Sequence, residues 1–171
     1  MDACDEKRRM TACFTGHREL PEPLKDVEAR VDRAIRDLYT QGVRFFGAGG
    51  ARGFDALASR RVLELKEKEL AGLRLILVLP FPEQYRQEGS WSREELEDFD
   101  DLLMRADKVV TLEAAYSNGV YFRRNRYLVE RSGWCVNYLL RGHSGTGQTV
   151  RCAREQGLTL IDLAPWEYRL P

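Results

Sequence analysis

Two glycine-rich segments carry the strongest chemical signal in the sequence. The first, GAGGARGFD, lies between an apolar run and a helical stripe of apolar residues. Glycines let backbone N–H groups approach an anion closely, and a helix N-terminus adds a partial positive charge. We therefore predict phosphate-binding residues in this segment: Gly49, Gly50, Arg52 and Gly53. Asp55 either stabilises the helix dipole or accepts a hydrogen bond from a ribose hydroxyl.

The first segment differs from the G-x-G-x-x-G dinucleotide fingerprint. Arg52 stands where the third glycine belongs, and the segment follows the second predicted strand rather than the first. The sequence therefore gives little support to hydride transfer.

The second segment, GHSGTGQT, has the spacing of a P-loop, but Gln148 replaces the lysine. Without a lysine to hold the β- and γ-phosphates, an ATPase is a poor interpretation. A backbone cradle for phosphate, assisted by the hydroxyls of Thr146 and Thr149, is the functional interpretation. A mobile surface loop is the alternative.

Other candidate residues lie close to strand ends. Thr15, Gly16, His17 and Arg18 follow the first apolar run and supply a hydroxyl, a flexible turn, a titratable group and a cation. Arginines at 123, 124 and 126 share a predicted helix, so they cannot all point into one site.

Two further features of the sequence have alternative interpretations. Tyr85 and Trp91 either stack on a base or pack in the core or a lid. The acidic run from Glu94 to Asp101 is interpreted as the solvated face of an amphipathic helix.

Strands and helices alternate along the chain and must position these residues. Apolar runs predict strands at Thr11–Thr15, Val43–Phe46, Leu73–Leu79, Lys108–Leu112, Trp134–Leu139 and Thr159–Leu163. Helical spacing predicts helices near residues 24–41, 54–65, 93–103, 121–132 and 148–156. This order favours an α/β fold, with one doubly wound, mostly parallel sheet and helices on both faces. The loops that follow its strands share one sheet edge, where ligands bind in such folds.

Length and composition indicate one domain over residues 1–171, with its core at about residues 11–163. The 27 basic residues balance 27 acidic ones, which argues against a long polyanion as partner but not against one small phosphate. Nucleic acid is therefore not the expected partner. The charged start has no apolar signal-peptide core, and no apolar run spans a bilayer, so we expect a cytoplasmic protein that does not bind membranes.

The four cysteines form no CxxC pair and favour reduced thiols. No metal site is expected, because His17 and His143 lie far from any cysteine pair.

Several motifs together resemble the YpsA-like proteins of the SLOG superfamily, which also includes the lonely-guy (LOG) phosphoribohydrolases and the DNA-processing protein DprA. The motifs are CFTGHR, GGARGFDALA, LPFP, ADKVV, RRNRYLVERS and SGTGQTVRCAREQG, which span about Cys13 to Leu163. The resemblance implies a Rossmann-like fold that binds a nucleotide or nucleotide sugar, such as ADP-ribose, NAD or a nucleoside monophosphate, with no required cofactor. It transfers ligand-binding roles to Gly16, Arg18, Arg52, Gly53, Asp55, Arg124, Asn125, Gly145, Thr146 and Thr149.

The sequence departs from the LOG enzymes at one position of their PGGxGTxxE motif. Thr149 stands where those enzymes carry their catalytic glutamate. Glycosidic cleavage needs a carboxylate, so Asp55 or Glu113 would have to replace it from a neighbouring loop.

Three functions therefore stay open. They are a nucleotide-binding sensor or uncharacterised enzyme, an N-glycosidic hydrolase, and a DprA-like single-stranded nucleic-acid binder. The first is preferred, and the sequence leaves a homodimer open.

Overall fold

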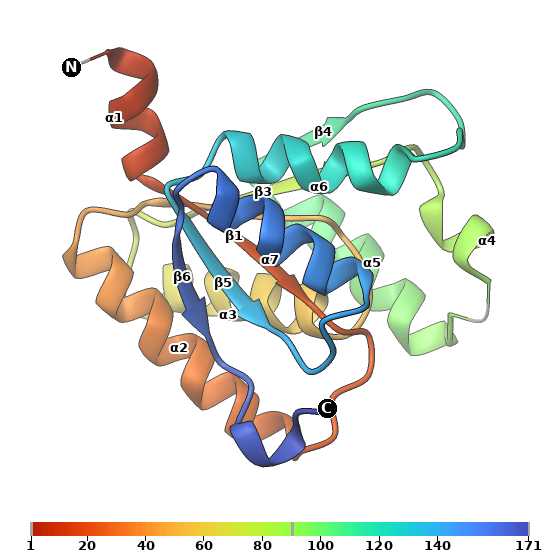
Figure 1. Ribbon diagram of the computed structural model, residues 1–171, viewed down its shortest axis with the longest axis horizontal. Coiled ribbons are helices and arrows are strands. Elements are labelled where there is room, and N and C mark those ends of the chain that lie inside the picture. Colours follow the sequence, from red (N-terminus) through yellow and green to blue (C-terminus); the bar gives the residue numbers. More distant parts are fainter. Residues whose placement is uncertain (1, 90, 171) are drawn as a thin grey trace.

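The computed structural model describes residues 2–89 and 91–170. Six strands form one sheet with the order β4-β3-β2-β1-β5-β6 (Figure 1). The strands are β1 Thr11–Gly16, β2 Phe45–Ala48, β3 Arg74–Leu79, β4 Lys108–Thr111, β5 Trp134–Tyr138 and β6 Thr159–Asp162. All five pairings between neighbouring strands are parallel. The predicted doubly wound α/β fold is confirmed.

Seven α-helices and one short 3-10 helix belong to the described residues. They are α1 Ala3–Arg9, α2 Leu24–Thr40, α3 Phe54–Lys68, α4 Gln84–Glu88, α5 Arg93–Arg105, α6 Val120–Glu130, α7 Gly145–Glu155 and η1 Trp166–Tyr168. A capping box begins α5, because Ser92 and Glu95 each accept a hydrogen bond from the other's backbone N–H. Within the part of the chain that the structure describes, no helix combines the length and the apolar character that crossing a bilayer requires.

The two faces of the sheet bury different cores, because successive strand residues point to opposite faces. On β1, Ala12 and Phe14 belong to the larger core, which includes the buried stripes of α2 and α3. Cys13 belongs to a smaller core with residues of α6 and α7, such as Leu128 and Ala153. In Figure 1, α7 crosses in front of the strands and α3 lies behind them.

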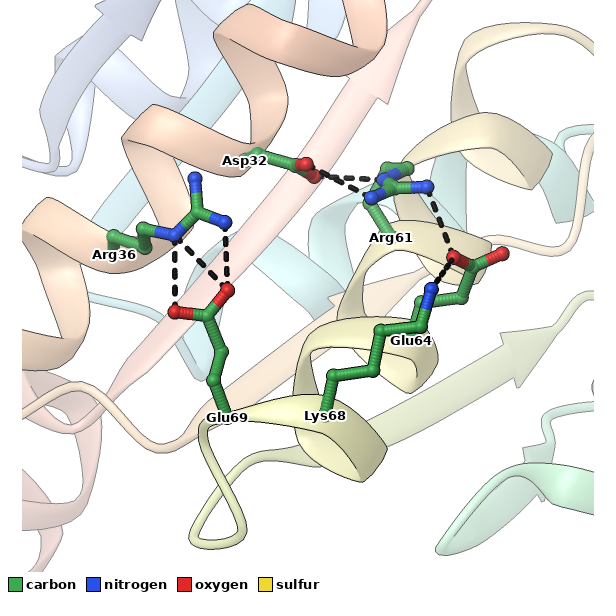
Figure 2. A network of polar contacts seen from close by, with 6 residues as sticks. All are labelled: Asp32, Arg36, Arg61, Glu64, Lys68 and Glu69. Carbon is green, nitrogen blue, oxygen red and sulfur yellow. Dashed lines mark hydrogen bonds and ion pairs between the residues drawn. The ribbon is translucent and has the colours of Figure 1, made fainter.

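Ion pairs bridge the exposed sides of α2 and α3 (Figure 2). Arg61 on α3 donates to both carboxylate oxygens of Asp32 on α2, at 2.7 and 2.8 Å, and it contacts Glu64 at 3.2 Å. Arg36 on α2 pairs with Glu69 after α3 at 2.6 Å. We call this network the α2–α3 seam.

Some elements differ from the sequence prediction. The sequence predicts the second strand at Val43–Phe46, whereas β2 runs from Phe45 to Ala48. The strand continues past Phe46 because Gly47 pairs with Cys13 of β1 and with Ile76 of β3. Helices α1 and α4 were not predicted. Each is seven residues or shorter, which is less than the periodicity of apolar residues can reveal.

The direction in which the chain winds changes beside β1. From β1 the chain adds β2, β3 and β4 on one side, and then it returns to place β5 on the other side. Helix α2 after β1 packs on α3, whereas α7 after β5 packs on α6, so the two loops leave toward opposite faces. Such a switch point leaves a crevice at the carboxyl ends of the two strands.

Candidate functional site

A cleft of about 510 Å³ lies at this switch point. The structure brings ten of the predicted site residues to its wall: Thr15, Gly16, His17, Arg18, Arg52, Asp55, Arg124, Asn125, Gly145 and Thr146. They come from the end of β1 and the loop after it, from the turn and first residues that begin α3, from α6 and from the first turn of α7. Residues separated by more than one hundred positions in the sequence therefore face one another across the cleft.

Five residues outside the predicted set also line the cleft: Glu19, Ala51, Tyr121, Arg141 and Ser144. Ser144 is the N-cap of α7, and its hydroxyl accepts a hydrogen bond from the backbone N–H of Gly147 at 3.0 Å. A serine three residues before an amide at the start of a helix is a recognisable capping signal. It shows that the second glycine-rich segment is the first turn of a helix rather than a loose loop.

Positive charge exceeds negative charge in the cleft wall. Four arginines line it, at positions 18, 52, 124 and 141, against two carboxylates, those of Glu19 and Asp55. Arginine binds phosphate groups well because its planar guanidinium presents several donors at once. The cleft is therefore suited to a small anion, although the whole chain is neutral.

Backbone amides add to this character. The backbone N–H groups of residues 50–53 lie just before α3, and those of Gly145 and Thr146 lie in the first turn of α7. N–H groups at the start of a helix are good donors to phosphate, and the helix dipole adds partial positive charge there.

Buried side chains hold the turn between β2 and α3 from behind. Gln84 of α4 is fully buried and donates to the carbonyl of Gly50 at 2.6 Å. Arg124 of α6 is 6% exposed and donates to the carbonyl of Gly49. Its Nε also donates to Asn125 Oδ1 at 2.7 Å. Arg124 therefore lines the cleft and fixes the turn at the same time.

Two glycines allow the loops after β1 and β2 to pack closely. A Cβ at Gly16 would lie 2.5 Å from the ring of Phe54, and one at Gly53 would overlap the backbone of Arg18. Gly53 also has a φ of +79°, which favours glycine. The N–H of Phe54 donates to the carbonyl of His17 at 3.1 Å. The packing of the two loops therefore requires glycine at both positions, whether or not these residues contact a ligand.

His17 connects the loops after β1 and β5. Its Nε2 accepts hydrogen bonds from the backbone N–H groups of Leu140 at 2.9 Å and Arg141 at 3.4 Å. Burial and the nearby Arg141 guanidinium lower the pKa of His17 below its ordinary value of 6.5. The neutral imidazole is the form that can accept these bonds, so His17 supports the cleft wall in that state.

The two carboxylates considered for catalysis lie in different places. Asp55 lines the cleft and is 7% exposed. Glu113 does not line it. The carboxylate of Glu113 accepts hydrogen bonds from the hydroxyl of Ser117 and from Arg123 Nε, and these contacts lower its pKa. Asp55 is therefore the carboxylate of the two that can face a ligand in the cleft.

Four other predicted residues lie outside the cleft wall. Gly50 and Gly53 line a neighbouring cavity, and Gly49 packs against Arg124. The hydroxyl of Thr149, at the position of the LOG glutamate, donates to the carbonyl of Gly145 at 3.0 Å within α7. These residues shape the turns, and direct ligand contact by them stays a prediction.

The described residues hold no group of three or more histidine, cysteine, aspartate or glutamate side chains that could hold a metal ion. All four cysteines are free thiols, and Cys13 and Cys135 are buried on adjacent strands.

The fold and the cleft together define the class of protein. A parallel, doubly wound sheet with its cleft at the switch point beside the central strand is a Rossmann-like arrangement. Residues 17–148, most of the chain, match the model of the YspA SLOG family (YpsA). The chain therefore belongs to this family, and the resemblance noted from its motifs is confirmed.

Curated relatives match over shorter stretches. A UPF0398 protein of Bacillus pumilus (strain SAFR-032) is 26% identical over 125 residues, which cover 72% of this chain and 65% of the relative. A UPF0398 protein of Oceanobacillus iheyensis is 26% identical over 115 residues, which cover 66% of this chain and 60% of the relative. The chain thus spans less than two thirds of the length of these relatives.

Solved structures share the fold. DNA processing protein A from Helicobacter pylori, described for its single-stranded DNA binding mode, has a TM-score of 0.65 and 16% identity. The alignment covers 96% of this chain and 69% of that one. DprA from Streptococcus pneumoniae has a TM-score of 0.65 and 17% identity, with coverage of 91% and 50%. At these identities the likeness shows the fold alone.

Proposed function

We propose that the cleft binds the phosphate part of a nucleotide or nucleotide sugar of the ADP-ribose or NAD kind. The observation that carries this proposal is the convergence of two helix starts and four arginines on one cleft. Arginine side chains and backbone donors at helix starts are the groups that proteins commonly use to bind phosphate. Family membership supports the same assignment, because it was the SLOG resemblance that implied a nucleotide-derived ligand.

Calorimetric titration tests this proposal. ADP-ribose, NAD, AMP and ribose 5-phosphate are titrated into the wild type, into Arg18→Ala and into the control Arg36→Ala. Arg18 lines the cleft, whereas Arg36 lies in the α2–α3 seam. At least one compound should bind the wild type and the control equally, and Arg18→Ala should bind it about tenfold or more weakly. Failure of all four compounds to bind, or equal binding by Arg18→Ala, would remove the proposal.

Hydrolysis of an N-glycosidic bond is the second candidate function, and the position of Asp55 favours it. A carboxylate in the cleft could stabilise an oxocarbenium ion or activate water. Incubation with AMP, ADP-ribose and NAD, followed by chromatography, would reveal free base or ribose phosphate. Product release that Asp55→Asn abolishes, with ligand affinity kept, supports the hydrolase. Tight binding without release supports a sensor.

Binding of single-stranded nucleic acid is the third candidate, suggested by the single-stranded DNA binding of the Helicobacter pylori neighbour. The neutral net charge of this chain argues against it, since such binding relies on many basic contacts. Titration with an oligothymidylate at increasing salt is the test. A steep fall of affinity with salt would favour nucleic acid over a small ligand.

A further inference from the structure

A second cavity, of about 260 Å³, adjoins the cleft. Arg18, Ala51 and Arg52 line both spaces, so the two meet at the glycine-rich turn before α3. The remaining wall of the second cavity comes mainly from α3 and α5. A ligand held by the shared arginines would therefore have this space beside it.

Aromatic rings form one wall of the second cavity. Trp91 and Phe99 line it, with ring centroids 5.4 Å apart at 86°. Tyr85 packs against both rings, at 6.1 and 6.0 Å, and supports them. Leu57 and Leu102 line the cavity as well. Walls of this kind suit a flat group with apolar faces.

The charges around the second cavity balance one another, unlike those of the cleft. Three arginines and three carboxylates line it, the latter being Glu94, Glu95 and Asp98. Asp98 pairs with Arg60 at 2.5 Å, and Glu95 lies 3.7 Å from Arg52. Glu94, Glu97, Asp100 and Asp101 of α5 are exposed, as the sequence interpretation of a solvated face expects, whereas Glu95 and Asp98 are half-buried beside these arginines. The cavity thus offers hydrogen-bond donors and acceptors but no excess charge.

We propose that the second cavity is the nucleobase subsite of the ligand whose phosphates occupy the cleft. A nucleobase is flat, uncharged and edged with donors and acceptors, so it fits the aromatic wall and the balanced rim. This inference rests on the proposed function of the cleft, and it adds that the base contributes to affinity. It predicts that nucleotides bind more tightly than ribose phosphate.

Paired titrations test the subsite. ADP-ribose and ribose 5-phosphate are titrated into the wild type, into Trp91→Ala and into the control Trp166→Ala, whose side chain is 80% exposed on η1. Trp91→Ala should bind ADP-ribose about tenfold more weakly and ribose 5-phosphate within about twofold of the wild type. Trp91→Phe should retain most of the affinity, because it keeps an aromatic ring.

Fluorescence gives a second readout that does not depend on the stability of the alanine variant. ADP-ribose should quench tryptophan emission in the wild type and in Trp166→Phe, but not in Trp91→Phe. This pattern would show that the ligand lies against Trp91 itself.

The possible outcomes separate the two proposals. Unchanged ADP-ribose affinity in Trp91→Ala would remove the base subsite and leave the phosphate cleft. An equal loss for both compounds would show that Trp91 merely supports the cleft, and this would also remove the subsite. If the wild type binds neither compound, the proposed function fails and the subsite fails with it.

Discussion

The α2–α3 seam and the cleft are both rich in arginine, but they use it differently. In the seam each arginine has a carboxylate partner across the helix pair, as Arg61 has Asp32 and Arg36 has Glu69 (Figure 2). In the cleft four arginines face two carboxylates. Arg124 there donates to a backbone carbonyl, and Arg52 lies 3.7 Å from its nearest acidic partner, Glu95.

This difference teaches how one neutral chain can contain an anion site. Paired charges in the seam nearly cancel at a distance, so the seam contributes to stability and offers little attraction to a ligand. In the cleft, arginines outnumber carboxylates, and packing and backbone hydrogen bonds hold the loops that carry them. Removing an arginine of the seam should therefore lower the stability of the protein, whereas removing an arginine of the cleft should weaken ligand binding.

The largest expected effect comes from the packing that holds the cleft. Gly53→Ala should lower the free energy of unfolding by about 3 kcal/mol or more, because the added Cβ overlaps the Arg18 backbone and φ is +79°. Gly145→Ala is the matched control, since its Cβ would meet no atom within 4 Å. Denaturant unfolding of both variants is the measurement. Similar stability for the two variants would show that the loops after β1 and β2 can move apart at little cost.

The next prediction compares an arginine of the seam with an arginine of the cleft. Removal of the first should lower stability and keep ligand affinity, whereas removal of the second should do the opposite. Arg61→Ala should lower the free energy of unfolding by about 1–2 kcal/mol, because it removes a bidentate pair whose side chains are 19% and 14% exposed. Its affinity for ADP-ribose should equal that of the wild type. Urea unfolding and calorimetry on the same preparation measure both quantities.

Arg52→Ala is the counterpart in the cleft. Its contact with Glu95 is long and partly exposed, so its removal should cost less than about 0.5 kcal/mol of stability. Affinity for ADP-ribose should fall about tenfold or more. If Arg52→Ala loses stability while keeping affinity, or if Arg61→Ala loses affinity, the contrast between seam and cleft is wrong.

The sequence predicts the cleft better than its supports. Strand ends in a parallel sheet meet at one edge, so Arg18, Arg52 and Thr146 could be grouped without coordinates. By contrast, Gln84 holds the turn from a five-residue helix that has no periodic signal. The sequence also could not predict which carboxylate of the acidic run on α5 would pair with an arginine of α3. Ion pairs such as Arg60 with Asp98, which are 38 positions apart, depend on how the two helices pack.

Glycines show the same limit. The sequence interpretation assigned Gly53 to phosphate binding because glycine lets an anion approach the backbone. It assigned Gly16 to a flexible turn, and the family resemblance implied a ligand contact there. In the structure these positions let the loops after β1 and β2 approach each other. Close approach of an anion and close packing of two loops both require glycine. The sequence alone does not distinguish them, because the two loops are distant in sequence and their contact depends on the fold.

The smallest effect should appear as a pH dependence confined to the cleft. Because the folded state lowers the pKa of His17 below 6.5, the unfolded chain binds its proton at higher pH than the folded chain does. The contribution of neutral His17 is therefore complete above pH 6.5 and decreases as the pH falls through the window below that value. Two carboxylates of the seam, those of Glu64 and Glu69, have pKa values lowered from 4.5, so they titrate in a more acid range.

Unfolding measured between about pH 5 and 7 tests this dependence. The free energy of unfolding should fall toward the acid side in the wild type and in His143→Ala, but less in His17→Gln. An identical slope in His17→Gln would mean that the hydrogen bonds from Leu140 and Arg141 do not depend on a neutral His17. The loops after β1 and β5 would then have to be held together without a contribution from the neutral imidazole.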